Sequence, residues 1–162
     1  MFLFLEVEQQ FVVDEILDHR AFVGALSLIL EPKDIVVFGT YGSRRDVNRF
    51  LWDHQIKPDE FISGARRTFK FWKREYPNGT AFGLKANPTV LARLVELLGP
   101  TSTPTDLCDH IVAYNSQFPI LSFHDAFKSD PCHISSRVPV AKVEAFCAAL
   151  GKPYALESVP EW

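Results

Sequence analysis

Residues 106–136 constrain the fold more than any other part of the chain, because three short runs typical of β-strands follow one another there with brief interruptions. The runs cover 106–114, 120–127 and 132–136, and turn-rich breaks cover 115–119 and 128–131. Strands joined by such short turns pair antiparallel with their neighbours in sequence. The stretch therefore predicts a three-stranded antiparallel meander over about 108–136.

A second antiparallel pair is indicated upstream of the meander. Pro77-Asn78-Gly79 is a strong hairpin turn signal, and it separates an aromatic and basic run, 66–76, from a second strand-like run, 80–86. We therefore expect a hairpin over 66–86. The apolar, β-branched run at 35–38 and the segment at 154–159 predict two further strands.

Apolar residues recur at helical spacing in four other stretches. The first predicts a helix starting near Gln9, with residues 21–30 left open between helix and strand, and the others predict helices over about 43–57, 88–98 and 139–150. Asn87 before the third helix and Gly99 after it are residues that commonly cap helix ends.

The order of these elements predicts the fold class. Strands come in adjacent antiparallel groups and do not alternate with helices, so we expect an α+β fold rather than a doubly wound parallel sheet. A chain of 162 residues is of the size of one domain, so residues 1–162 are expected to form a single compact domain. Three to four helices should cover one face of a mainly antiparallel sheet.

Charge and cysteine usage limit the classes of function. The net charge of −3 gives no overall attraction to nucleic acid. The three cysteines form no CxxC pair, which fits a reducing compartment better than a disulfide framework. The longest apolar run, residues 21–30, is much shorter than the roughly 20 residues of a membrane helix. Together with an acidic N-terminus unlike a signal peptide, these features predict a soluble cytoplasmic protein.

The meander contains three of the five histidines. If its first turn comprises residues 116–118, His110 lies opposite His124, and Ile111 lies opposite Phe123. A one-residue slip would mix apolar and polar side chains on each face, so the matching of apolar residues favours this register.

In that register, His110 and His124 with Asp109 or Asp125 are candidate catalytic residues, since an imidazole beside a carboxylate can act as a general base. His110, His124 and His133 are also candidate metal ligands, with the two meander cysteines expected nearby. The spacing matches no structural zinc motif. The simpler interpretation, which we rank above both, is a polar outer face of the sheet.

The turn at 39–45 connects a buried strand to a helix. Backbone N–H groups at a helix start favour an anion, and Arg44 and Arg45 add positive charge, so the turn is a candidate phosphate or nucleotide site. Its glycine spacing fits neither the dinucleotide nor the P-loop motif. A tight turn with solvated arginines is therefore the favoured interpretation.

The run at 66–76 interleaves basic and aromatic residues. Its candidate binding residues are Arg67, Lys70, Trp72 and Arg74. Charge and stacking of this kind can hold nucleic acid, but an acidic protein partner would use the same patch and ranks above it. The acidic chain as a whole favours a simpler structural interpretation, an edge strand protected by its charges.

These observations rank the functions. We expect first a small cytoplasmic binding protein without a catalytic motif, which acts by occupying a protein partner as immunity proteins and small regulators do. A small hydrolase with a His/Asp site on the meander, metal-assisted or not, is the alternative, and an anion sensor at 39–45 is the next. No cofactor, nucleic-acid partner or membrane association is expected, and a homodimer is compatible with the chain.

Overall fold

The computed structural model describes residues 7–57 and 79–160, and the side chains of 9–57 and 79–158. Within these residues the chain forms one seven-stranded sheet in the order β3-β2-β4-β5-β6-β1-β7, and every neighbouring pair is antiparallel. The strands are β1 (Val7–Val13), β2 (Ile35–Thr40), β3 (Thr80–Lys85), β4 (His110–Tyr114), β5 (Pro119–Phe123), β6 (Cys132–Ser135) and β7 (Ala155–Pro160). The predicted α+β class with a mainly antiparallel sheet is confirmed.

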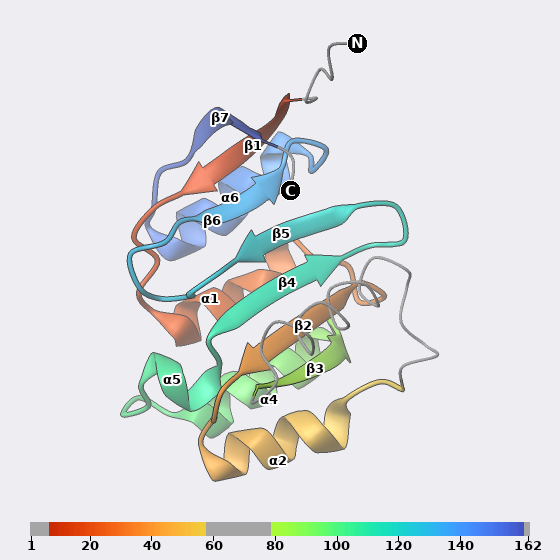
Figure 1. Cartoon of the computed structure of the whole chain (residues 1–162), viewed down its shortest axis with the longest axis vertical. Helices are drawn as coiled ribbons and strands as arrows, with labels where there is room; N and C mark the ends of the chain where they lie inside the picture. The colour runs from red at the N-terminus through yellow and green to blue at the C-terminus, as the bar shows by residue number, and fades with distance from the viewer. Residues whose placement is uncertain (1–6, 58–78, 161–162) are drawn as a thin grey trace.

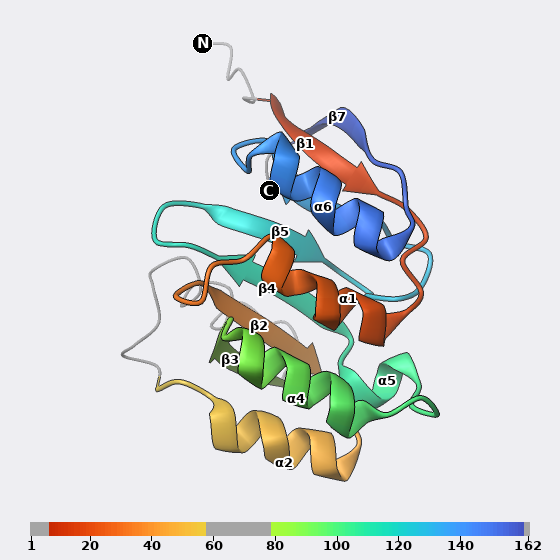
Figure 2. The same ribbon diagram turned by 180° about the vertical axis from the view of Figure 1, so that it is seen from behind.

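Helices lie on one face of this sheet (Figure 2). The helical segments are α1 (His19–Ala25), the 3-10 turn η1 (Leu26–Leu28), α2 (Arg45–His54), α4 (Pro88–Leu98), α5 (Pro104–Leu107) and α6 (Val140–Leu150). The layer of helices over the sheet consists of α1, α4 and α6, and α2 lies beside α4 and β3 at one end of the molecule. Figure 1 shows the opposite face of the sheet, which we call the second face. No helix among these segments is long and apolar enough to cross a membrane.

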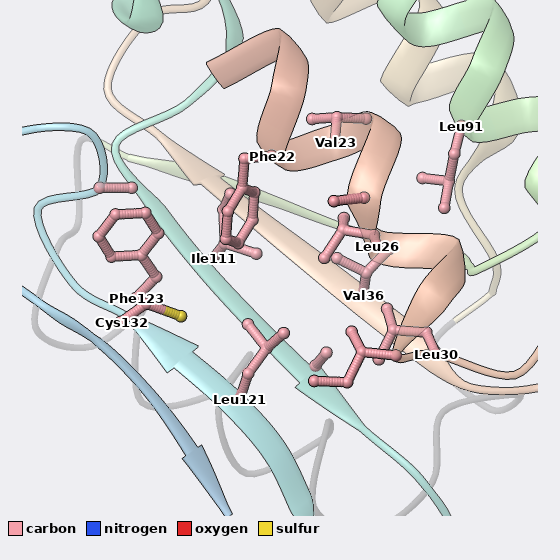
Figure 3. Close-up of a cluster of buried hydrophobic side chains, with 14 of the residues drawn as sticks. Phe22, Val23, Leu26, Leu30, Val36, Leu91, Ile111, Leu121, Phe123 and Cys132 are labelled. Carbon is pink, nitrogen blue, oxygen red and sulfur yellow. The ribbon is translucent and has the colours of Figure 1, made fainter. Parts of the chain in front are cut away.

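The main core fills the space between the helices and the sheet. Phe22 of α1 is fully buried, and its ring lies 5.3, 5.5 and 5.7 Å from the rings of Phe123, Phe127 and Phe146. Such tilted and edge-on aromatic pairs add stabilisation beyond the burial of their area. Figure 3 shows how side chains of α1, β2, β4 and β5 meet in this core.

The meander register agrees with the sequence prediction. Ile111 pairs with Phe123, and Val112 pairs with Ser122. A bulge then leaves Ile120 as an extra residue on β5, where it joins the main core. The predicted order of β4, β5 and β6 as consecutive antiparallel neighbours is confirmed. The first strand of the predicted 66–86 hairpin lies outside the described residues, and its second strand is β3.

The predicted helix from Gln9 is wrong, because Val7–Val13 is a strand. β1 lies between β6 and β7, and Phe11, Val12 and Val13 are all buried. A strand buried on both faces loses the polar–apolar alternation that identifies strands in a sequence. The helix begins instead at His19, where the Asp18 carboxylate accepts a hydrogen bond from the Ala21 N–H. Residues 21–30 continue as helix and then as the 3-10 turn.

The second face carries a smaller apolar cluster over β2, β3 and β4. Its members alternate along the strands with residues of the main core. They are Ile35, Val37, Ala81, Val112 and Tyr114. Burial raises the pKa of the Tyr114 phenol to about 12, so this side chain is protonated and uncharged at neutral pH.

Removing the central ring of the main core should destabilise the fold strongly. We expect Phe22→Ala to lower the free energy of unfolding by about 3–5 kcal/mol, through lost burial and the cavity left between three other rings. Urea denaturation followed by circular dichroism measures the change. Leu28→Ala, at a side chain that is 44% exposed, is the matched control and should change it by less than about 1 kcal/mol. A cost for Phe22→Ala no larger than that of the control would contradict this description of the core.

Candidate functional site

Three histidines project from the second face of the sheet, and we call them the histidine face. His110 starts β4, His124 directly follows β5, and His133 lies within β6. Their chain neighbours Ile111, Phe123 and Ile134 all belong to the main core on the helix side, and side chains alternate along a strand. The ring centroids of His110 and His124 are 5.9 Å apart. The predicted juxtaposition of these two histidines is therefore present.

One hydrogen bond specifies the protonation state of His110. The backbone N–H of Asp125 donates to Nδ1 of the imidazole at 3.1 Å. A nitrogen that accepts a hydrogen bond carries no proton, so the ring is neutral and its proton is on Nε2. The Tyr41 ring packs edge-on against the same imidazole at 6.1 Å. His110 is thus a hydrogen-bond donor through Nε2 and is unsuited to act as a base through Nδ1.

Burial lowers the pKa of all three histidines. For His110 and His133 it is the largest effect, only partly opposed by nearby carboxylates. For His124 burial is again the main cause, and positive charge on either of the other two imidazoles would lower its pKa further. The histidine face is therefore neutral at pH 7.

The two predicted carboxylates have different surroundings. The Asp109 carboxylate accepts a hydrogen bond from the Tyr41 N–H at 2.8 Å, and the Asp109 backbone bonds to Gly39 and Ala126. Asp109 therefore ties the β2–α2 loop to the turn after β5. Asp125 is exposed beside His110, and its backbone has a φ of 44°, in the left-handed region that non-glycine residues seldom adopt.

The cysteines of the meander do not join the histidines. Cys108 and Cys132 lie in the main core, on the opposite side of the sheet, and Figure 3 shows the Cys132 side chain among apolar residues. Burial raises the pKa of both thiols, which disfavours the thiolate that a metal requires. In the part of the chain that the structure describes, no three His, Cys, Asp or Glu side chains are arranged to hold a metal ion. The predicted ligands His110, His124 and His133 therefore do not form such a group.

The turn at 39–45 uses its N–H groups within the protein. Three of them donate to protein oxygens at 2.8–3.0 Å: Tyr41 to the Asp109 carboxylate, Gly42 to the Thr40 hydroxyl and Arg44 to the Asp106 carbonyl. These three N–H groups are therefore already used within the protein and are not offered to an external anion.

Arg44 connects three helices. Its guanidinium donates to the carbonyl oxygens of Leu97 and Leu98 at 2.7 and 3.0 Å, at the C-terminal end of α4. It also forms an ion pair with Asp46, and Asp106 of α5 is 4.0 Å away. Arg44 is the residue before the first turn of α2, so these contacts fix where α2 begins. Of the two predicted anion-binding arginines, Arg44 is therefore structural.

A surface that the sequence analysis did not identify lies along α2. Its members are Arg45, Asn48, Arg49 and Trp52, which recur at the i, i+3, i+4, i+7 spacing of one helix face. We call them the α2 stripe. Together with Arg44 and Asp46, these four side chains line an open depression on the surface.

Trp52 is the apolar end of the α2 stripe, and Arg45 and Arg49 are its positive part, two turns and one turn nearer the start of the helix. The Trp52 side chain is 63% exposed, while its ring contacts the buried Phe82 edge-on at 6.5 Å. Across the described ranges, no ion pair involves Arg45 or Arg49. The signal was present in the sequence: Val47 and Leu51 mark the buried side of this helix, and the stripe consists of exposed residues outside that side.

The other predicted binding residues, Arg67, Lys70, Trp72 and Arg74, lie outside the described residues. Comparisons of the chain with protein-family models, curated proteins and solved structures find no match. The functional argument therefore depends on the geometry of the histidine face and the α2 stripe.

The histidine face should make stability depend on pH below neutrality. Folding lowers the pKa of each of these histidines below the ordinary histidine value of about 6.5. Just below that pH the unfolded chain therefore binds more protons than the folded protein. This stability is present above that pH and is lost as the pH falls through the folded-state values. We expect Tm to fall between pH 7.5 and 5.5, by roughly 2–4 °C for each kcal/mol lost.

Calorimetry of two variants isolates the contribution of this face. His124→Gln should reduce the fall in Tm, whereas His54→Gln, which removes a histidine of α2, should retain it. A fall that is equally large in His124→Gln and in the unmodified chain would show that His124 does not contribute to it.

Proposed function

We propose that this chain is an interaction protein that binds an acidic surface of a protein partner through the α2 stripe. The observation that carries the proposal is the exposure of Trp52 on the same helix face as two arginines that form no ion pair in the described part of the chain. Tryptophan and arginine are the residues that most often dominate the energy of protein interfaces. An exposed indole with two guanidinium groups to one side of it suits a partner that offers carboxylates beside an apolar residue.

The support for α2 favours binding without rearrangement. Arg44 anchors the start of the helix to the carbonyl oxygens of α4, while Val47 and Leu51 are fully buried beneath it. The stripe is therefore presented on a helix whose position is already determined. Less conformational entropy is lost on binding when the contact surface is ordered in advance.

A protein partner fits the charges better than nucleic acid. The chain has a net charge of −3, so its overall field repels a polyanion. The stripe itself is positive only locally, and Asp46 at its edge is neutralised by Arg44. A discrete acidic patch on a protein can match such a local surface, whereas a long phosphate backbone would also lie against the acidic rest of this protein's surface.

A reducing compartment such as the cytoplasm suits this chain, because Cys108, Cys132 and Cys147 are all buried free thiols.

Matched substitutions test the proposal on a purified partner. A photo-crosslinking residue in place of Asn48 can identify the bound protein, and calorimetry with the purified pair then gives Kd. We expect Trp52→Ala and Arg49→Glu each to weaken binding at least about tenfold, or about 1.4 kcal/mol. Trp52→Phe should keep most of the affinity, because it retains an aromatic ring.

Arg93→Glu, at an exposed position of α4, is the charge-matched control and should change Kd by less than about twofold. An equal loss in Arg93→Glu and Arg49→Glu would indicate a general charge effect. Unchanged binding by Trp52→Ala would remove the α2 stripe as the contact surface.

Hydrolysis at the histidine face is the second candidate function. It is favoured by the 5.9 Å separation of the His110 and His124 rings, and His110 has a defined tautomer that can donate through Nε2. If it is correct, the protein hydrolyses some member of a panel of activated carboxylic and phosphate esters, and His124→Gln lowers that rate at least about 100-fold. His54→Gln should leave the rate unchanged. Turnover that survives His124→Gln, or no turnover of any ester, argues against this candidate.

A further inference from the structure

We propose that His110 and the turn after β5 form a pH-sensitive latch, in which neutral His110 holds the backbone of Asp125 and protonation of His110 releases it. The inference goes beyond binding at the α2 stripe and does not depend on it. It is carried by a hydrogen bond whose direction is fixed by chemistry and by the backbone conformation of the turn that this bond holds.

The hydrogen bond exists only in one protonation state. The Asp125 N–H donates to Nδ1 of His110 at 3.1 Å, so Nδ1 must offer a lone pair. An imidazolium carries a proton on both ring nitrogens and has no acceptor. Protonation therefore places two N–H groups face to face, and the Asp125 end of the turn loses its bond.

The turn adopts a conformation that needs support. Asp125 has a φ of 44° and Phe127 a φ of 67°, and neither is glycine. Side chains disfavour this left-handed region, so the conformation persists only where surrounding contacts stabilise it. The hydrogen bond to His110 is one such contact for Asp125.

The rest of the turn is held independently, which limits the release to one end. The Ala126 N–H donates to the Asp109 carbonyl at 2.8 Å, and Ala126 and Phe127 are buried in the main core. Neither contact involves the His110 ring. Loss of the His110 bond should therefore free Asp125 while Ala126 and Phe127 stay in place.

Several groups influence when His110 takes up a proton. The carboxylates of Asp109, which precedes β4, and Asp125, in the turn itself, favour the charged ring, whereas Lys128 and burial disfavour it. The His124 imidazole and the Tyr41 ring of the β2–α2 loop pack against it. Burial is the largest effect and lowers the pKa of His110. The latch is therefore closed at pH 7 and opens only at a pH below the ordinary histidine pKa of about 6.5.

Nuclear magnetic resonance of the full chain tests the latch directly. Nitrogen shifts of the His110 ring report its tautomer and charge, and the protection of the Asp125 amide against hydrogen exchange reports the bond. At pH 7.5 we expect the proton on Nε2 and a protected Asp125 amide. As His110 becomes protonated toward pH 5, the protection factor of Asp125 should fall at least about tenfold, while that of Ala126 should change little.

His110→Asn provides the matched variant, because its amide oxygen can occupy the place of Nδ1 and accept the same bond at any pH. Protection of Asp125 in this variant should not depend on pH, and in His110→Ala it should be low throughout. If either variant fails to fold, the titration of the unmodified chain remains decisive. A proton on Nδ1 at pH 7.5, constant protection of Asp125 while His110 titrates, or global unfolding before His110 titrates would each overturn the proposal.

Discussion

The register between the sheet and the main core is the constraint on which the rest of the structure depends. Ile111, Phe123 and Ile134 must point toward the helices, where the rings around Phe22 pack. Because successive side chains of a strand point to opposite faces, their chain neighbours His110, His124 and His133 must then lie on the second face. A shift of one residue would place imidazoles in the core and apolar side chains outside it. The packing of apolar groups thus positions the histidine face and brings the His110 and His124 rings together.

The histidine face and the α2 stripe are connected through the loop between β2 and α2. Asp109 accepts the Tyr41 N–H, and the backbone of Asp109 joins both Gly39 and the turn that contains Asp125. A few residues along the chain, Arg44 fixes the start of α2 to the end of α4. The same loop therefore touches the ring that governs the proposed latch and leads into the helix that carries the proposed contact surface.

Sequence reasoning succeeded where local patterns and tertiary packing agree. The turn of the meander and the matching of apolar residues across it predicted the pairing of Ile111 with Phe123. Asn87 and Gly99, as typical capping residues, predicted the two ends of α4. It failed at β1, because a strand buried on both faces shows no alternation of polar and apolar residues. The strands that pair with β1, namely β6 and β7, come from distant parts of the chain, so local sequence does not reveal them. For the candidate sites, alternation predicted the approach of His110 and His124. The bond from Asp125 to His110 could not be predicted, because it depends on a left-handed backbone at a residue that is not glycine.

The central claim is that packing of the helix-side core sets the register that brings the histidines together on the second face. A nuclear Overhauser spectrum of the protein at pH 7.5 tests it most directly. We expect contacts between ring protons of His110 and His124, whose centroids are 5.9 Å apart, and between Tyr41 and His110. We also expect the side chain of Phe123, and neither histidine, to contact Phe22. Contacts from His110 or His124 to Phe22 would mean that the register is shifted by one residue and would contradict the account.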